Sequence, residues 1–321
     1  MITKCYAGID CGGTKIAGAL FDPEGNILFR DTVLLGGSGG DAAFARMREL
    51  TGSLFGQAAA RRLVPVSLGV CIPGIAYHDS GRVWAPNIPD WENYPLLDRL
   101  KEAHGKDLPV AIDSDRACCI LGETWLGAAK GCRNAVFVAV GTGIGAGLLI
   151  DGNILRGHGD IAGATGWMAL EPPYDTKYDM CGNFEYYASG NGIVRAAEEC
   201  LAEEKDRHST LKSGKYTSYD VFLAYDQNDP AAICALDKVI TLWGMAAANY
   251  VSLFNPEKII FGGGVFGPAV RFIPRIRAEA EKWAQPISMK QVTFSASGLD
   301  TDAGLFGAGR LAMLNERKDK E

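Results

Sequence analysis

Residues 6–22 read YAGIDCGGTKIAGALFD: an apolar run that ends at Asp10, a turn rich in glycine, and a second apolar run. Two apolar runs joined by a short Gly-rich turn predict a β-hairpin. A turn without Cβ atoms exposes its backbone N–H groups, which bind anions and phosphate above all. We therefore expect Gly12, Gly13 and Thr14 to cradle a phosphate group. Asp10 lies at the mouth of this turn, where a carboxylate usually faces Mg²⁺.

The same pattern returns at residues 136–154, which read VFVAVGTGIGAGLLIDGNI. The second turn is Gly141-Thr142-Gly143, and no carboxylate there matches Asp10. A repeat of this length predicts a duplicated fold whose two turns close on a nucleoside triphosphate from both sides. Two ordinary glycine hairpins are the alternative. A dinucleotide-binding turn is disfavoured, because Ala146 takes the place of its third glycine and a strand follows.

The composition is that of an ordinary globular protein with room for two domains: 321 residues, 47% hydrophobic and 22% charged, with a net charge of −6. No Lys/Arg cluster indicates nucleic acid or an acidic membrane as a partner. No apolar run approaches the roughly 18 residues of a membrane span. The first strand begins almost at the N-terminus, so we expect no signal peptide and a cytoplasmic location.

The nine cysteines are scattered, and none has C-x-x-C or C-x-C spacing. Without an export signal, reduced thiols are expected rather than a disulfide framework. With only four histidines, a zinc site built from neighbouring residues is not expected.

Alternating apolar patterns and helical spacings predict an α/β fold with mixed sheets and helices on their faces. We expect an N-terminal domain over 1–124 and a C-terminal nucleotide-binding domain over 125–321, whose last helix can pack back on the first domain. The expected strands are 5–11, 16–21, 26–34, 67–72, 82–84, 110–112, 135–140, 146–150, 154–156, 258–261 and 291–295. The expected helices are 41–62, 94–104, 116–126, 193–204, 220–224, 230–253, 272–283 and 303–315, with an exposed loop at 205–215.

Asp115 is the residue most suited to catalysis. It follows a predicted strand and begins a predicted helix, where ligands of open α/β sheets bind. A carboxylate there can take the proton of a hydroxyl group that attacks phosphorus. The alternative is that Asp115 only caps the helix, and spacing alone favours this. Asp113 has the same two interpretations.

Three further segments carry candidate ligand contacts. Gly262-Gly263-Gly264 follows a strand and either lets a flat ring or ribose approach or makes a strand-to-helix turn. Asn87 lies in a Pro-bounded loop near two tryptophans, which suits a sugar, although a packed surface loop has the same composition. Glu185 could accept a hydrogen bond from a hydroxyl group or serve as the acid of a first helical turn.

Taken together, the motifs resemble those of the ROK family of sugar kinases, within the actin/hexokinase/Hsp70 superfamily, over nearly the whole chain. The matching segments are Asp10-Cys11-Gly12-Gly13-Thr14-Lys15, Gly69-Val70-Cys71-Ile72-Pro73-Gly74, Ala85-Pro86-Asn87-Ile88-Pro89, Asp113-Ser114-Asp115 ahead of Gly122-Glu123, Gly141-Thr142-Gly143-Ile144-Gly145, Gly262-Gly263-Gly264 and Asp302-Ala303-Gly304-Leu305-Phe306-Gly307-Ala308.

The resemblance implies two ribonuclease-H-like (actin-like ATPase) domains with a cleft that closes over ATP, Mg²⁺ and a sugar. It makes Asp115 the catalytic base. It assigns the phosphates to the two hairpin turns, Lys15 included, and the adenosine to residues 262–264. It also implies a homodimer.

The chain departs from the family pattern around the sugar and the zinc. The family's A-G-E-x-G-H becomes Ala162-Gly163-Ala164-Thr165-Gly166-Trp167, so that Ala164 replaces the sugar-binding Glu and Trp167 replaces the His. The C-x-C-G-x-x-G-C-x-E segment becomes residues 178–185, in which only Glu185 survives. We therefore expect no structural zinc. The sugar contacts implied are Gly74, Asn87, Ser114 (in place of Asn), Asp115, Trp167 and Glu185.

The leading hypothesis is an ATP-dependent kinase for a sugar or sugar-like polyol other than plain glucose, because lost hydrogen-bond partners weaken the recognition of an ordinary hexose. The second is a non-catalytic sugar sensor. It would lack DNA contacts, since about four residues precede the first strand and a helix-turn-helix needs more. The third is a phosphotransferase of the same superfamily that acts on an acylated amino sugar.

Overall fold

The computed structural model describes residues 3–203, 209–212 and 215–318. The chain divides into two compact units. Unit 1 contains Met1–Gly131, Arg156–Ala162 and Asp302–Glu321, and unit 2 contains Cys132–Leu155 and Gly163–Thr301. The expected boundary at 124/125 therefore lies too early. The segment 156–162, expected in the second domain, belongs to unit 1, and the last helix packs on unit 1, as was expected to be possible.

Unit 1 is built on a five-stranded sheet with the order β3-β2-β1-β4-β7. The first three strands form an antiparallel meander, and β4 and β7 add to it in parallel. A separate two-stranded sheet pairs β5 with β6. The strands are β1 (Thr3–Cys11), β2 (Lys15–Phe21), β3 (Ile27–Leu34), β4 (Leu63–Ile72), β5 (Ile75–Tyr77), β6 (Arg82–Trp84) and β7 (Val110–Ser114).

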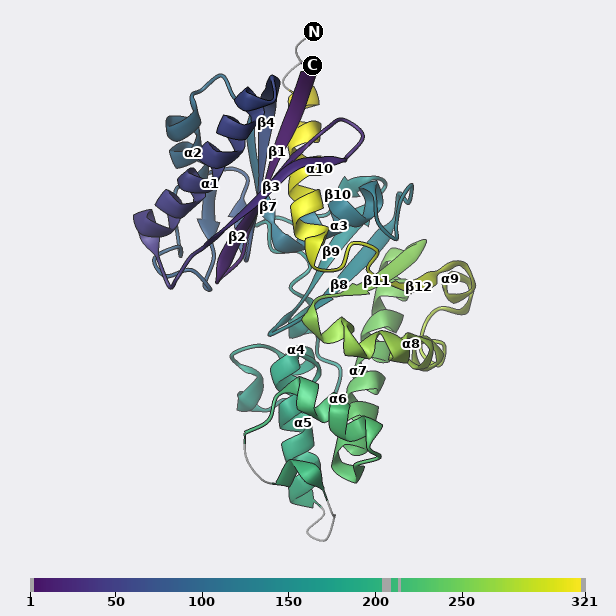
Figure 1. Ribbon diagram of the computed structural model, residues 1–321. Helices are drawn as coiled ribbons and strands as arrows, with labels where there is room; N and C mark the ends of the chain where they lie inside the picture. Colours follow the sequence, from purple (N-terminus) through teal and green to yellow (C-terminus); the bar gives the residue numbers. More distant parts are fainter. Residues whose placement is uncertain (1–2, 204–208, 213–214, 319–321) are drawn as a thin grey trace. The chain divides into compact units, whose positions relative to one another are not determined.

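Helices cover both faces of this sheet (Figure 1). One layer contains α1 (Gly40–Ala60) and α2 (Leu96–His104), and the other contains α3 (Asp115–Trp125) and α10 (Ala303–Lys318). The apolar side chains of α1 recur at helical spacing and pack on the sheet, with Phe44, Met47, Leu50 and Leu54 buried. The last helix therefore adds its buried face to a unit whose other elements come from the N-terminal part of the chain.

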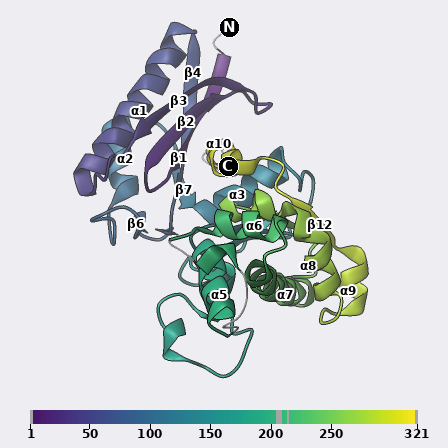
Figure 2. The ribbon, with the colours of Figure 1, turned by 60° about the horizontal axis from the view of Figure 1, so that its bottom comes forward.

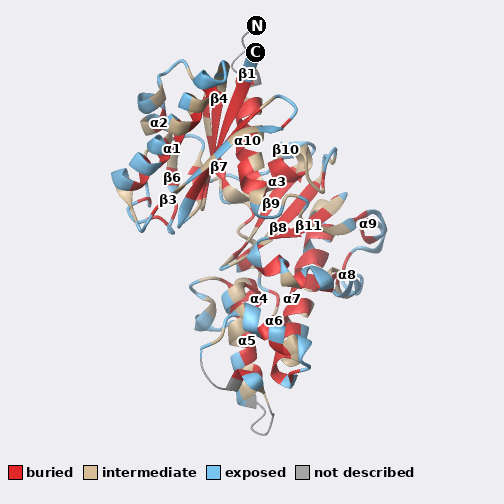
Figure 3. Cartoon of the chain, in the orientation of Figure 1, coloured by how far each residue is buried: buried red, intermediate tan, exposed pale blue. Residues whose placement is uncertain are grey.

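Unit 2 repeats the plan of unit 1, with the strand order β10-β9-β8-β11-β12. Again a three-stranded antiparallel meander comes first and two parallel strands follow. The expected duplication of the fold is thus confirmed. The strands are β8 (Ala135–Val140), β9 (Ile144–Ile150), β10 (Asn153–Ile154), β11 (Lys258–Gly262) and β12 (Thr293–Ala296), and the central strands of both sheets are buried (Figure 3).

The helices of unit 2 are α4 (Asn183–Ala188), α5 (Gly190–Glu203), α6 (Ser218–Asp226), α7 (Pro230–Phe254), α8 (Ile273–Ala280) and α9 (Pro286–Gln291). Short 3₁₀ turns are η1 (Thr165–Trp167), η2 (Thr176–Tyr178), η3 (Thr210–Lys212), η4 (Gly264–Phe266), η5 (Pro268–Phe272) and η6 (Asp300–Asp302). Figure 2 shows α7 between α5 and α8, and it packs on both.

Of the described helices, α7 is the one long and apolar enough, by length and composition, to cross a membrane, a feature that the sequence reading overlooked. Of the apolar 18-residue stretch within α7, 67% is buried inside the protein. Trp243 and Tyr250 of this helix are almost fully buried, and the Trp243 indole N–H donates to the Ala188 carbonyl oxygen at 3.0 Å. Packing in the core of unit 2 therefore accounts for the apolar composition of α7.

Several local expectations were wrong. Strand β9 begins at Ile144 instead of residue 146, and β10 ends at Ile154, where a strand was expected to begin. Neither the three-residue strand β5 nor the short helix α9 was expected. Cys200 and Cys234 form a disulfide, because α5 and α7 lie side by side and bring the two Cα atoms to 6.2 Å, whereas the other seven cysteines are free. Within the expected loop 205–215, residues 205–208 and 213–214 lie outside the described residues.

Candidate active site

Polar side chains of unit 1 gather at the carboxyl end of its parallel strands. The register places Asp10 of β1 opposite Cys71 of β4, and Cys71 opposite Asp113 of β7. Strand β7 ends at Ser114, and α3 begins at the next residue, Asp115. This edge of an open α/β sheet is the usual place for ligands.

The structure separates the roles of the polar residues at the start of α3. Ser114 is the N-cap, and its hydroxyl oxygen accepts from the Ala117 N–H at 3.3 Å. The interpretation that Asp115 caps this helix is therefore wrong. Asp115 is the first helical residue, and its carboxylate accepts from the Arg116 N–H at 2.8 Å.

The Asp115 side chain retains 50% of its surface exposed, so a ligand can reach it. Loss of solvation raises the pKa of Asp115 to about 6, and the negative charge of Asp10 adds to this rise. The positive charge and the backbone N–H of Arg116 act in the opposite direction and lower the pKa. A carboxyl group with such a pKa is ionised at neutral pH and is a better proton acceptor than an ordinary aspartate.

Asp113 has a structural role. Its side chain is buried, and it accepts from Arg156 Nη2 at 2.5 Å, with His78 Nε2 at 3.7 Å. Burial alone would raise the pKa of Asp113, but hydrogen bonds and charges from His78 and Arg156 lower it. His78 also bonds Asp160 through Nδ1 at 2.8 Å. These contacts anchor the segment 156–162 on unit 1.

Asp10 lies under the first turn of α10. A Cβ atom added to Gly304 would come within 2.9 Å of the Asp10 carboxylate oxygen Oδ2, so the carboxylate packs directly against this helix start. Burial raises the pKa of Asp10, a hydrogen bond from Cys71 opposes this, and the charge of Asp302 adds to the rise. A nearby cation would favour the ionised form. A single carboxylate fits Mg²⁺ that is held mainly by nucleotide phosphates.

The first hairpin turn lies beside the predicted sugar loop. The Gly12 N–H donates to the Lys15 carbonyl oxygen at 2.9 Å, and the Leu35 N–H donates to the Thr14 carbonyl oxygen at 2.9 Å. A Cβ atom on Gly13 would contact Asn87 at 3.3 Å. Gly74 adopts a φ of +126° and its carbonyl oxygen accepts from Arg116 Nη2 at 3.3 Å, which places Gly74 beside Asp115. Unit 1 thus brings together all its predicted site residues.

The second hairpin turn is braced by Glu185. The Ile144 N–H donates to Glu185 Oε2 at 2.6 Å, and a Cβ atom on Gly143 would lie 2.8 Å from the same oxygen. Glu185 lies in the first turn of α4, which confirms the expectation of an acid in a first helical turn, and burial raises its pKa. It therefore supports the turn as well as being a candidate sugar contact.

Two adjoining cavities of unit 2 are lined by five of its six predicted nucleotide residues, and Gly143 lines neither of them. One, of about 670 Å³, is lined by Gly141 and Thr142, and the other, of about 330 Å³, by Gly262 and Gly263. Gly264 and Tyr219 line both. Gly263 has a φ of +87° and its backbone lies against Val140, so this turn requires glycine.

Sequence reasoning missed the part of this site contributed by α5 and α6. Asn191 and Arg195 of α5, and Ser218 and Tyr219 of α6, line the larger cavity. A signal was present, because Thr217 and Asp220 form a capping box that predicts a helix start. The spacing could not show that this helix start faces the second hairpin.

The segment that departs from the zinc motif is held by hydrogen bonds. Asn183 stands where the motif has its last Cys, and its amide oxygen accepts from the Leu170 N–H at 3.0 Å and the Glu171 N–H at 3.1 Å. Trp167 is exposed, on the turn η1. Among the described residues, no three His, Cys, Asp or Glu side chains are arranged to hold a metal ion.

Known proteins resemble this chain both in sequence and in structure. A family model described as the ROK family matches residues 6–314. Glucokinase from Halalkalibacterium halodurans is 33% identical over 329 residues, which cover 98% of this chain and 97% of that protein. The solved ROK hexokinase from Thermus thermophilus superposes with a TM-score of 0.81 at 27% identity, covering 98% and 99% of the two chains. A ROK glucokinase from Streptomyces griseus, in complex with glucose and AMPPNP, superposes with a TM-score of 0.76 at 27% identity, covering 97% and 99%.

Proposed function

Because the chain belongs to the ROK family, we propose that it is an ATP-dependent kinase that phosphorylates a hydroxyl group of a sugar or sugar-like polyol. The observation that carries this proposal is Asp115. Its carboxylate is half exposed, is not the helix cap, and lies at the ligand-binding edge of the sheet with a pKa raised to about 6.

In the reaction, Asp115 accepts the proton of the attacking hydroxyl group. The sugar oxygen forms a bond to the γ-phosphorus while the bond from that phosphorus to its bridging oxygen breaks, and ADP leaves with the electron pair. Asp10 would help to hold a Mg²⁺ ion bound to the nucleotide phosphates, and such an ion would supply positive charge to balance the charge on the phosphate oxygens. Gly12, Gly13, Thr14 and Lys15 of unit 1, and Gly141, Thr142 and Gly143 of unit 2, are the proposed phosphate contacts.

The proposed sugar contacts are Gly74, Asn87, Ser114, Asp115, Trp167 and Glu185. Ala164 and Trp167 stand where the family motif has a Glu and a His, so two polar partners of an ordinary hexose are missing. A site that loses hydrogen-bond partners discriminates strongly against the substrate that needs them. We therefore propose a substrate other than plain glucose.

The test is ADP release from Mg-ATP across a panel of hexoses, ketoses, amino sugars and cyclitols. Phosphorylation of one member of the panel, lost in Asp115→Asn, supports the kinase. If ATP binds but no member of the panel is phosphorylated, the non-catalytic sensor is favoured instead.

The activity should depend on pH through Asp115. The carboxyl group must be ionised to accept a proton, and its pKa is about 6. We expect kcat/KM to be constant above about pH 7 and to fall about tenfold per pH unit below about pH 6. The measurement is kcat/KM for the best sugar from pH 5 to 8.5. A profile that stays flat down to pH 5 would contradict the assignment of Asp115 as the base.

Replacing Tyr219 should weaken ATP binding. Its ring lines both nucleotide cavities, where it can stack on adenine or ribose. Base–aromatic stacking contributes about 1–3 kcal/mol, so we expect Tyr219→Ala to raise KM for ATP by about tenfold or more while kcat stays within about twofold. Tyr219→Phe, which retains the ring, serves as the control. An unchanged KM in Tyr219→Ala would exclude this contact.

A further inference from the structure

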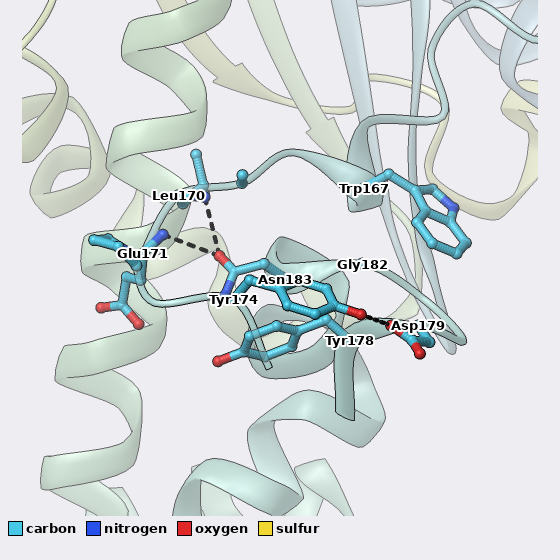
Figure 4. A pocket seen from close by; sticks show the side chains of 10 residues that line it. Trp167, Leu170, Glu171, Tyr174, Tyr178, Asp179, Gly182 and Asn183 are labelled. Carbon is cyan, nitrogen blue, oxygen red and sulfur yellow. Dashed lines mark hydrogen bonds between the residues drawn. The ribbon is translucent and has the colours of Figure 1, made fainter. Parts of the chain in front are cut away.

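A third cavity of unit 2, of about 400 Å³, lies in the segment 167–183, which departs from the zinc motif (Figure 4). Three aromatic side chains, those of Trp167, Tyr174 and Tyr178, line it together with apolar groups of Leu170 and Pro172. Cavities of about 300–1,000 Å³ are the usual size of small-molecule sites. Among the described residues that line this cavity, Trp167 is the one that is also a proposed sugar contact, so the proposed reaction leaves most of the space unused.

The charged side chains that line the cavity are carboxylates. Glu171 and Asp179 line it, and within the described part of the chain no lysine, arginine or histidine does. In the view of Figure 4, the Tyr174 and Tyr178 rings lie between these two acidic residues. Two carboxylates that no basic lining residue balances repel an anion and attract a cation. The charge of the cavity therefore favours a positively charged ligand.

The aromatic walls add to this attraction for a cation. The negative face of a tyrosine or tryptophan ring attracts an ammonium group that lies within about 6 Å of the ring centroid. One ring of the cavity already makes such a contact, because Lys177 Nζ lies 5.3 Å from the centroid of the Tyr178 ring. Lys177 does not line the cavity, and its ammonium group lies 3.9 Å from carboxylate oxygens of both Asp175 and Glu199. The carboxylates of the cavity are therefore left for a ligand.

Contacts around the cavity hold its walls in place. The Tyr174 hydroxyl group donates to the Asp179 carboxylate, which orients both side chains although the Tyr174 side chain is 75% exposed. The Tyr178 ring packs edge-on against Tyr186, at 5.4 Å between ring centroids. Walls that are already oriented need little ordering when a ligand binds, which improves affinity.

We propose that this cavity binds a small organic cation, whose methyl or methylene groups pack on the aromatic rings and whose charge is balanced by Glu171 and Asp179. A bare metal ion would leave the aromatic and aliphatic walls without a partner, and a neutral sugar would leave the two negative charges unbalanced. Binding of the cation requires residues of unit 2 alone. It is therefore expected whether or not the chain phosphorylates a sugar.

The test is calorimetric titration of the full chain with two organic cations and an uncharged analogue of each. The pairs are choline with dimethylbutanol, in which a carbon atom replaces the nitrogen, and putrescine with butanediol. At least one cation should bind at one site per chain, about tenfold or more tightly than its uncharged analogue. The proposal is overturned if neither cation binds, or if the uncharged analogues or methyl glucoside bind this cavity as tightly.

Variants of the lining residues show whether the cation binds in this cavity. Glu171→Gln combined with Asp179→Asn keeps the shape of both side chains and removes their charge, so the affinity for the cation should fall about tenfold. Tyr174→Leu, which removes a ring, should lower it about fivefold. Met180→Ala is the matched control, because it truncates a side chain of the same segment that is 88% exposed and does not line the cavity.

The unfolding temperature of each variant shows whether the segment still folds. Tyr174 is largely exposed, so Tyr174→Leu keeps the test decisive if the double variant is unstable. Loss of cation binding in a folded variant, with binding retained in Met180→Ala, supports the site. Unchanged affinity in both cavity variants would show that the cation binds elsewhere and would reject the proposal. Because binding is measured without ATP or a sugar, its outcome is independent of whether the proposed kinase activity is found.

Discussion

Asp115→Asn should lower kcat by about 10²–10⁴-fold, which is the usual contribution of a general base. The amide has nearly the same shape as the carboxylate but cannot accept the proton of the attacking hydroxyl group. KM for ATP should change little, because Asp115 is proposed to contact the sugar hydroxyl group and lines neither of the two proposed nucleotide cavities. Steady-state kinetics with the best sugar, together with calorimetric titration of ATP, measure the two effects separately.

The stability of the same variant separates catalysis from structure. Because the pKa of Asp115 in the folded protein is raised, its ionised form costs folding free energy above about pH 6, and below the unfolded pKa this cost vanishes. A neutral asparagine avoids the cost, so the unfolding temperature at pH 7.5 should not fall. If activity and unfolding temperature fall together, Asp115 has a structural role and the assignment as base is wrong.

Much of the fold was predictable, because its signals are local. Apolar runs on both sides of a Gly-rich turn predict each of the two hairpins. The repetition of this pattern predicts the second sheet of unit 2, which has the same plan as the sheet of unit 1. The elements that were missed carry weak local signals. Strand β5 has three residues and α9 has six, and a short element depends on its tertiary contacts more than on its own sequence.

The sequence supplied candidate residues for the site, but it did not supply the contacts around them or the residues of α5 and α6. Spacing alone favoured Asp115 as the helix cap, whereas the bond from the Ala117 N–H to the Ser114 hydroxyl oxygen shows that Ser114 is the cap. The Asn183 amide oxygen accepts hydrogen bonds from the backbone N–H groups of Leu170 and Glu171, which lie 13 and 12 residues earlier in the chain. No periodicity predicts such a contact, because it depends on how the segment 167–183 folds back.

The division into units shows the same limit. Arg156 and Asp160 follow the second hairpin in sequence but are held by Asp113 and His78 of unit 1. Charge pairs between residues so far apart in sequence leave no pattern in a single chain. The expected boundary therefore misassigned the segment 156–162.

Gly307→Ala should destabilise the protein by about 3 kcal/mol or more, the upper range for overpacking a tight interface. Gly307 lies in α10 where this helix crosses α3, and an added Cβ atom would lie 1.8 Å from the Cys118 carbonyl oxygen. The obstructing atom is backbone, so it cannot move without shifting α3. Nearby, a Cβ atom on Gly69 would lie 2.0 Å from the Ala308 carbonyl oxygen, so α10 also packs directly on β4. Urea unfolding at equilibrium measures the effect.

Gly56→Ala is the matched control, since it makes the same change in an exposed part of α1 where a new Cβ atom meets nothing within 4 Å. It should stabilise the protein by about 0.5–1 kcal/mol, because alanine favours the helix more than glycine does. The difference in unfolding free energy between the two variants separates the cost of the steric clash from the higher helix propensity of alanine. Because α10 also places Gly304 against Asp10, any shift of this helix that relieves the clash at Gly307 should disturb the Asp10 carboxylate. Gly307→Ala should therefore lose activity at temperatures where it is still folded, and full activity in a destabilised variant would show that the position of α10 does not control Asp10.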